Sequence, residues 1–245
     1  MVVPAYNEEA SVAAVVAELQ AVAPGVDVVV VDDGSRDQTA RRARDAGAVV
    51  LALPFNLGVG GAMRTGYLYG FRNDYDVVVQ VDADGQHDPS QLPLLLAGLA
   101  QSNIVVGARF AGVGSYRVRG PRRVAMRLLS GALSRTAGTR LTDATSGFRA
   151  VDRAALGLFA RHYPAEYLGD TVESLVMAVR AGLTVSQVPV QMRVRTAGVP
   201  SQSPLKASLY LGRAVLALAL AYVRTRHELL PTTLPVEPRE ERASS

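Results

Sequence analysis

Short apolar runs alternate with helical patterns along the first hundred residues of this chain. The runs are rich in valine and nearly continuous, which is typical of strands with both faces covered. We expect strands at Met1–Val3, Val26–Val31, Val49–Leu53, Val77–Val81 and Ile104–Val106. This alternation favours an α/β fold in which a mostly parallel sheet is flanked by helices.

Apolar residues between the runs recur at intervals of three and four, as on helices with one buried face. One such stripe consists of Val12, Val15, Val16, Leu19 and Val22. The same pattern predicts helices over Asp37–Ala46, Gly60–Phe71, Ser90–Ala100, Pro121–Thr136, Arg153–Phe159 and Thr171–Ala181. A last strand pair is expected at Val185–Val190 and Met192–Arg195.

The C-terminal part of the chain differs from this pattern. Ser203 and Pro204 suit the first turn of a long amphipathic helix over residues 202–230. The stretch 231–245 is proline-rich and charged, which predicts disorder. We therefore divide the chain into a main domain at residues 1–201, this helix and a tail.

Composition narrows the possible functions. The hydrophobic fraction of 49% indicates a globular fold, and the absence of cysteine excludes disulfides, thiolate metal sites and cysteine nucleophiles. Lys206 is the one lysine among 26 basic residues. Arginine is suited to phosphate recognition, although a biased genome explains such a skew equally well. The arginines accompany neither an aromatic platform nor a nucleic-acid-binding motif, so we expect no nucleic-acid partner.

The first residues carry no basic start followed by an apolar run, so no signal peptide is predicted and a cytoplasmic location is expected. Because a strand of three residues is short, we also expect the natural start to lie a few residues upstream.

The stretch VVVQVDADGQHDP contains the strongest chemical signal. Asp82 and Asp84 are two residues apart after an apolar run, and side chains two apart on an extended strand share a face. Together with the amide oxygen of Gln86, they are hard oxygen ligands suited to Mg²⁺ or Mn²⁺. Such ions are commonly completed by substrate phosphates, which indicates a diphosphate-bearing substrate.

Two further polar clusters, PAYNEE and VDDGSRD, also follow predicted strands. In doubly wound sheets ligands bind at this edge. Capping is the alternative for Asn7, for Ser35 with Gln38, and for Asp88. The glycines at 58, 60 and 61 lack the spacing of a dinucleotide fingerprint, so close helix–strand packing is the expected role. His87 is expected to be structural.

Seven motifs appear in order over residues 1–201: VVPAYNEE, VVDDGSRDQT, NLGVGGAMRTG, QVDADGQHDP, GARF, DATSGFRA and RTAGVPS. Together they resemble inverting glycosyltransferases of the GT-A (Rossmann-like) fold, most closely the dolichyl- and polyprenyl-phosphate mannosyl- and glucosyltransferase branch. The resemblance implies a nucleotide pocket lined by Pro4, Tyr6, Glu8, Val31, Asp32 and Asp33. It implies a metal and diphosphate segment at Asp82, Ala83, Asp84 and Gln86, and phosphate-binding arginines at Arg109, Arg123 and Arg195.

Two positions leave details of the resemblance open. The family pattern after Arg195 has a lysine that this chain lacks, and Lys206 is a candidate replacement. Asp170 with Glu173 fits a helix cap. In related enzymes acidic residues near this position face the acceptor, which makes Asp170 the candidate general base for a hydroxyl acceptor.

The resemblance implies transfer of a hexose from a nucleoside-diphosphate sugar to a lipid phosphate. Rival interpretations are transfer to a glycan or glycolipid hydroxyl, a nucleotidyltransferase, and a non-catalytic nucleotide-sugar binding module. Lys206, Arg213 and Arg224 lie within about 20° of one line on the C-terminal helix. That line, and the arginine-rich segment 119–135, suit the anionic inner face of the cell membrane; packing against the core or a dimer contact is the alternative.

Overall fold

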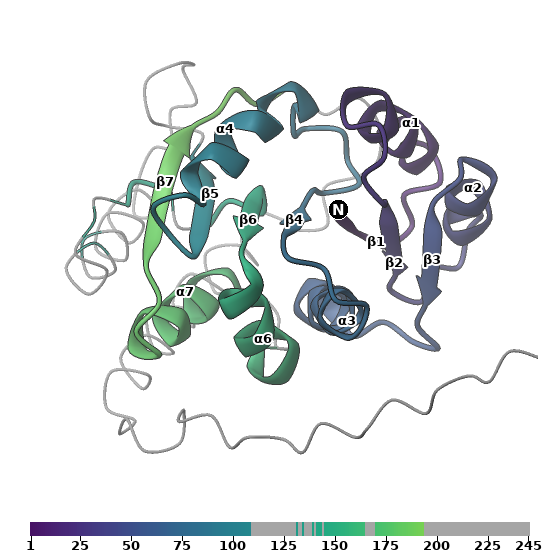
Figure 1. The fold of residues 1–245 in the computed structure, drawn as a ribbon. Coiled ribbons are helices and arrows are strands. Elements are labelled where there is room, and N and C mark those ends of the chain that lie inside the picture. The colour runs from purple at the N-terminus through teal and green to yellow at the C-terminus, as the bar shows by residue number, and fades with distance from the viewer. Residues whose placement is uncertain are drawn as a thin grey trace, which may run out of the picture.

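The computed structural model describes residues 1–108, 131, 134, 139, 141–143, 145–164 and 170–193, and of Asp170 the backbone alone. Its centre is a seven-stranded sheet in the order β3-β2-β1-β4-β6-β5-β7 (Figure 1). The strands are β1 (Val2–Ala5), β2 (Val29–Asp32), β3 (Val49–Ala52), β4 (Val78–Gln80), β5 (Ile104–Ala108), β6 (Arg149–Val151) and β7 (Val185–Pro189). β6 pairs antiparallel with both neighbours, whereas the other pairings are parallel.

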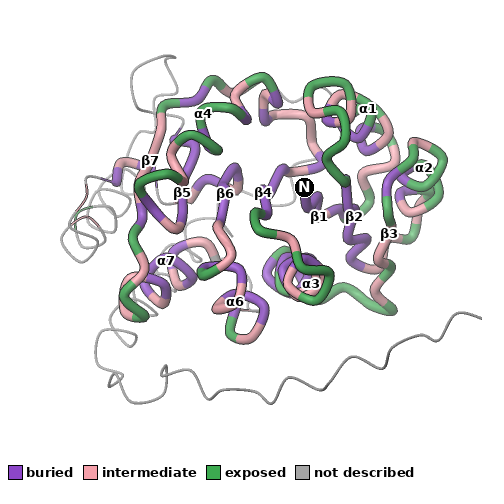
Figure 2. The backbone as a smooth tube through the Cα atoms, in the orientation of Figure 1, coloured by how far each residue is buried: buried purple, intermediate pink, exposed green. Residues whose placement is uncertain are grey.

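Helices cover both faces of the sheet, as Figure 1 shows. On one face lie α1 (Val12–Val22), α2 (Thr39–Asp45), the 3-10 helix η1 (Pro89–Gln91) and α4 (Leu92–Gly98). On the other lie α3 (Gly58–Arg72), α6 (Arg153–His162) and α7 (Asp170–Arg180). The inner strands are buried, whereas the edge strands β3 and β7 are partly exposed, as are the outer helix faces (Figure 2). Burial on both sides is why the valine runs of the inner strands are almost uninterrupted. The predicted α/β sheet is thus confirmed, and the predicted C-terminal helix lies outside the described residues.

Two elements differ from the prediction. β6 was not predicted: it has three residues, and its first, Arg149, is a charged side chain that is fully buried. The expected strand Met192–Arg195 is wrong as a partner of β7, because Met192 forms an isolated antiparallel bridge with His87 instead. Residues 194 and 195 lie outside the described part.

Two glycines of α3 let the helix lie close to the sheet. A Cβ at Gly66 would lie 2.3 Å from Val2 Cγ1, and one at Gly70 would lie 2.7 Å from Val78 Cγ2. Neither was among the glycines predicted to pack closely. Gly58 begins the helix with φ 81°, a backbone conformation that favours glycine, so its place in a tight turn has a physical reason. Close packing of Gly58, Gly60 and Gly61 against a strand stays a prediction.

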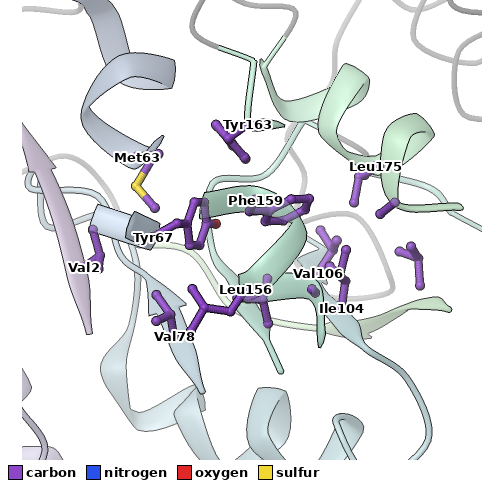
Figure 3. Packing of buried hydrophobic residues seen from close by; sticks show 14 of the residues in the cluster. Val2, Met63, Tyr67, Val78, Ile104, Val106, Leu156, Phe159, Tyr163 and Leu175 are labelled. Carbon is purple, nitrogen blue, oxygen red and sulfur yellow. The ribbon is translucent and has the colours of Figure 1, made fainter. Parts of the chain in front are cut away.

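An aromatic group joins α3 to α6 and the turn after it (Figure 3). The rings of Tyr67, Phe159 and Tyr163 have centroids 5.0–5.2 Å apart and are all buried. Tilted and edge-to-face arrangements at these distances are favourable for aromatic rings. The group fixes the position of α6 against the helix that begins at the candidate site.

Phe159→Ala should therefore lower the free energy of unfolding by about 3–5 kcal/mol, because it removes the central ring and leaves a cavity. The measurement is urea unfolding followed by circular dichroism. The matched control is Phe55→Ala, since Phe55 is 63% exposed and its loss should change stability by about 0.5 kcal/mol or less. Equal effects of the two substitutions would contradict the packing role.

Candidate active site

The carboxyl edge of the sheet has a break in strand order beside β1. The chain runs outward from β1 through β2 to β3, then returns to place β4 on the other side of β1. In open α/β sheets such a switch point forms a crevice at the carboxyl ends of the strands, where ligands bind. The polar segments after β1, β2 and β4 all follow strands at this switch point, as the sequence predicted.

The loop after β1 is joined to the loop after β2 by reciprocal hydrogen bonds. The Asn7 amide donates to Ser35 Oγ at 2.9 Å, and the Arg36 amide donates to Asn7 Oδ1 at 2.9 Å. The Glu8 amide donates to Thr39 Oγ1 at 2.8 Å. Asn7 has φ 54°, a left-handed conformation that asparagine tolerates better than most residues. The two loops therefore behave as one unit.

The residues predicted to line a nucleotide pocket lie in this unit. Tyr6 is 42% exposed, Pro4 is half-buried, and Val31 is fully buried at the centre of β2. The Glu8 carboxylate accepts a hydrogen bond from Ser11 Oγ at 2.9 Å. Nucleotide binding by these residues stays a prediction.

Asp32 and Asp33 are both buried, and each carboxylate accepts backbone hydrogen bonds. Asp32 accepts from the Ser35 amide at 3.2 Å. Asp33 accepts from the amides of Leu57 at 2.7 Å and Gly58 at 2.8 Å, which open α3. Burial raises the pKa of Asp33 above its ordinary value, although these two amides oppose the shift. This link between the β2 and β3 ends has no local sequence signal and was not predicted.

Of the two helix caps predicted at Asp88 and at Ser35 with Gln38, the structure contains the first and not the second. Asp88 accepts from the Ser90 amide at 3.0 Å and caps η1, as predicted. The capping box of Ser35 with Gln38 is wrong, because α2 begins at Thr39, whose amide donates to Asp37 Oδ1 at 2.9 Å. Ser35 is instead the hydrogen-bond partner of the loop after β1.

The acidic turn, which we define as residues 82–86, follows β4. The strand ends at Gln80, and Ala83 and Asp84 lie in a turn with Gly85 at φ 73°. The expectation that Asp84 follows Asp82 on an extended strand is therefore wrong, and a shared face for the two carboxylates stays a prediction. Asp84 Oδ1 accepts from the Gln86 amide at 3.0 Å, which shapes the turn. Ala83 is buried beneath it.

Asp82 is held by neighbours that are themselves buried. Its amide donates to His87 Nδ1 at 3.0 Å, and its Oδ1 accepts from Gln80 Nε2 at 3.3 Å. The His87 side chain is 2% exposed and stacks on Phe148 at 4.9 Å between centroids, whereas the Asp82 side chain is 37% exposed. The structural role expected for His87 is confirmed.

The acidic turn is also attached to the end of the described chain. The Arg193 amide donates to the Gln86 carbonyl at 2.9 Å. The Arg193 guanidinium donates to Glu18 at 2.6 Å and to Asp88 at 2.7 Å. The segment after β7 is thus fixed beside the acidic turn and α1.

Asp88 should make the protein sensitive to acid. Burial alone would raise the pKa of Asp88, but hydrogen bonds from Ser90 and the charge of Arg193 outweigh it and hold that pKa below its usual value. A lowered carboxyl pKa contributes stability above the unfolded value near about 4, and that stability is lost as the pH falls through the folded value. Asp88→Asn should lower the free energy of unfolding by up to about 1 kcal/mol at pH 7. The difference should shrink between pH 4 and pH 3 in chemical denaturation, and a constant difference would contradict the assignment.

Four predicted site residues cannot be placed. Arg109, Arg123 and Arg195 lie outside the described residues, as does the side chain of Asp170. Their roles stay predictions.

The donor set at the acidic turn fits a divalent cation completed by substrate. No group of three or more histidine, aspartate or glutamate side chains in the described stretches could hold a metal ion alone. Two carboxylates and an amide oxygen with diphosphate oxygens form a set that Mg²⁺ accepts. A Cβ at Gly147 would lie 2.8 Å from both Asp82 carboxylate oxygens, so glycine leaves room for that carboxylate.

Comparison with known proteins identifies the family. Residues 1–158 match the family described as Glycosyl transferase family 2. The chain belongs to glycosyl transferase family 2. This confirms the resemblance inferred from the seven motifs, and the protein is a nucleotide-sugar-dependent glycosyltransferase with the GT-A fold.

Relatives of this family 2 glycosyltransferase include lipid-phosphate transferases. It is 33% identical to the undecaprenyl-phosphate mannosyltransferase of Micrococcus luteus, over 82% of this chain and 86% of that protein. It is 29% identical to the polyprenol monophosphomannose synthase of Mycolicibacterium smegmatis, over 83% of this chain and 80% of that protein. It is 28% identical to the UDP-N-acetylglucosamine–dolichyl-phosphate N-acetylglucosaminyltransferase of Methanococcus voltae, over 78% of this chain and 84% of that protein.

A solved structure with the same fold is glucosyl-3-phosphoglycerate synthase from Mycobacterium tuberculosis with Mn²⁺, UDP and glucosyl-3-phosphoglycerate. Its TM-score is 0.67, at 23% identity over 90% of this chain and 78% of that one. The same enzyme has been solved with Mg²⁺ and UDP.

In the part of this family 2 glycosyltransferase that the structure describes, no helix combines the length and apolar character needed to cross a bilayer.

Proposed function

We propose that this glycosyltransferase moves a hexose from a nucleoside-diphosphate sugar to a polyprenyl phosphate, with Mg²⁺ or Mn²⁺ at the acidic turn. The observation that carries the proposal is the likeness to the undecaprenyl-phosphate mannosyltransferase, which extends over 82% of this chain and 86% of that protein. The acidic turn at the switch point supports it, since a diphosphate bound there would lie between the loops after β1 and β4.

The residues of the site would act mainly by binding and orientation. Asp82, Asp84 and the Gln86 amide oxygen would hold the cation, and the loop after β1 would hold the nucleoside. A bound divalent cation supplies positive charge where the leaving diphosphate becomes more negative. Groups placed there stabilise the transition state more than the ground state.

The acceptor determines whether a general base is needed. A phosphate oxygen of the lipid is already anionic near neutral pH, so it can attack the anomeric carbon without losing a proton. The new carbon–oxygen bond forms as the bond to the diphosphate breaks, and the diphosphate leaves with the electron pair. Direct displacement of this kind inverts the anomeric centre.

We place the reaction at the cytoplasmic face of the membrane, where a prenyl phosphate would present its headgroup. The basic line of Lys206, Arg213 and Arg224 supports this location from the sequence alone. Co-sedimentation with vesicles should increase with anionic lipid and decrease with salt. Binding that is insensitive to both would contradict the location.

The test of the activity uses the full chain, radiolabelled GDP- and UDP-hexoses, Mn²⁺, and a panel of acceptors. Label should enter the organic phase with polyprenyl phosphate and stay in the aqueous phase with the non-phosphorylated polyprenol. Transfer to an added glycan instead would overturn the acceptor, and release of free sugar alone would overturn the transfer.

A further inference from the structure

We propose that Gln80, His87 and Gly147 are positioning residues that together fix the Asp82 carboxylate and so set the affinity of the metal–nucleotide site. The inference rests on the proposed function, because it takes Asp82 as a ligand of the cation. None of the three residues was predicted to have this role, and they come from β4, the turn after it and the loop before β6.

Gln80 fixes one oxygen of the carboxylate. Its Nε2 lies 3.3 Å from Asp82 Oδ1, whereas its Oε1 is buried and has no hydrogen-bond partner among the described residues. A buried amide oxygen without a partner is unfavourable. Turning the amide over would place that oxygen against the Asp82 carboxylate, which is worse. The amide orientation is therefore dictated by the carboxylate, and its NH₂ group is committed to Asp82.

His87 fixes the main chain and lies beside the other oxygen. Because its Nδ1 accepts from the Asp82 amide, a neutral ring carries its proton on Nε2. That atom lies 3.6 Å from Asp82 Oδ2, beyond hydrogen-bond distance but close enough for electrostatic attraction. The ring itself cannot turn freely, since it is buried and stacked on Phe148.

Gly147 bounds the Asp82 carboxylate from a third side. We call Gln80, His87 and Gly147 together the cradle. A Cβ at this position would lie 2.8 Å from both Asp82 oxygens and 3.0 Å from Gln80 Nε2. Those distances are shorter than carbon normally approaches oxygen, so the carboxylate occupies the space that only glycine leaves. The carboxylate is thus in contact with Gly147, while the Asp82 side chain is still 37% exposed.

A buried arginine holds the glycine in place. Arg149 pairs with Gln80 across the β4–β6 ladder, and its guanidinium donates to the Ser146 carbonyl at 2.9 Å and to Ser174 Oγ at 3.1 Å. Because Ser146 precedes Gly147, the contact fixes the backbone at the cradle. Arg149, the first residue of β6, therefore helps to fix Gly147, which lies two residues before it and contacts the Asp82 carboxylate.

Gln80→Leu is the decisive variant. It removes the donor to Asp82 and also the unpartnered oxygen, so thermal stability should stay equal to wild type or rise. Affinity for Mn²⁺ should fall about 10- to 100-fold, as is typical when a partner of a metal ligand is lost. The measurement is the free Mn²⁺ signal by electron paramagnetic resonance, titrated with the full chain and UDP or GDP. Transfer should recover when Mn²⁺ is raised to saturation, which a general folding defect would not produce.

Gly147→Ala tests the same carboxylate by steric pressure alone, and it should also weaken Mn²⁺ binding. The matched control is Gly157→Ala on α6, where a Cβ would meet the Phe71 ring at 3.2 Å and no site residue. This control should bind Mn²⁺ as wild type does. Equal Mn²⁺ affinity of the two alanine variants would contradict the role of Gly147.

His87 is tested by two substitutions. His87→Asn keeps an acceptor near the position of Nδ1, whereas His87→Phe keeps a ring to stack on Phe148 but has no acceptor. The asparagine variant should retain the higher Mn²⁺ affinity, and the opposite order would show that His87 acts through packing.

Wild-type Mn²⁺ affinity in Gln80→Leu would overturn the cradle and leave the proposed function intact. If the wild-type chain bound no Mn²⁺ with either nucleotide, both the role of the cradle and the proposed metal-dependent function would be wrong. If the chain bound Mn²⁺ but transferred no sugar to polyprenyl phosphate, the Mn²⁺ titrations and the role of the cradle would be unaffected.

Discussion

Asp84→Asn should lower kcat for glycosyl transfer by at least about 100-fold, the loss expected when one electrostatic stabiliser of the transition state is removed. The substitution suits the site because asparagine keeps an oxygen that can accept from the Gln86 amide, now 3.0 Å from Asp84 Oδ1. The acidic turn should therefore retain its shape while the charge that holds the cation is lost. Initial rates with labelled donor and saturating acceptor, measured across Mn²⁺ concentrations, give the effect.

The control for this variant is Asp76→Asn. Asp76 is exposed and precedes β4 at its amino end, so the same chemical change is made beside the opposite end of that strand, away from the carboxyl edge. Its rate should stay within about twofold of wild type, since surface substitutions away from special features have small effects. Metal-dependent transfer by Asp84→Asn at the wild-type rate would remove the metal role from the acidic turn.

Periodicity predicts the described α/β frame well because it reflects local burial. The three valines of β2 form a continuous apolar run because helices cover both faces of the sheet there. The predicted stripe on α1 is buried from Val12 to Leu19, whereas its last member, Val22, is exposed. The same reasoning fails at β6, which is only three residues long and begins with Arg149. Among the described residues its guanidinium donates to the carbonyl of Ser146 and the hydroxyl of Ser174, contacts that no local pattern reveals.

In the candidate site, too, some residues could be predicted from the local sequence and others only from the fold. Asp82 and Asp84 were predicted as ligands from their position after an apolar run, because ligand-binding side chains collect at strand ends, and that role stays a prediction. The residues that hold them were not found, since contacts such as Gly147 with Asp82 join segments 65 residues apart in number only through the fold. Alternation also misplaced Asp84, because the chain turns at Ala83 once β4 has ended.

The contact between Asp33 and the start of α3 indicates how the nucleotide side of the crevice is built. The Asp33 amide donates to the Ala5 carbonyl at 2.8 Å, and its carboxylate accepts from Leu57 and Gly58. At Gly34, a Cβ would lie 2.7 Å from the Phe55 carbonyl carbon, so the ends of β2 and β3 are in direct contact. Through its amide and its carboxylate, Asp33 thus connects the end of β1, the end of β2 and the start of α3.

Asp33→Ala should consequently lower the free energy of unfolding by about 2–5 kcal/mol, because it leaves two amides at the start of α3 without their acceptor. Asp33→Asn should have an intermediate effect: it removes the buried charge but offers one acceptor oxygen in place of two. The order wild type, asparagine, alanine is measured by urea unfolding at pH 7. In isothermal titration with UDP or GDP and Mn²⁺, both variants should bind more weakly than wild type, since the loop after β2 would lose its attachment to the start of α3. Unchanged stability of Asp33→Ala would show that water replaces the carboxylate at this position, and the joining role would then be wrong.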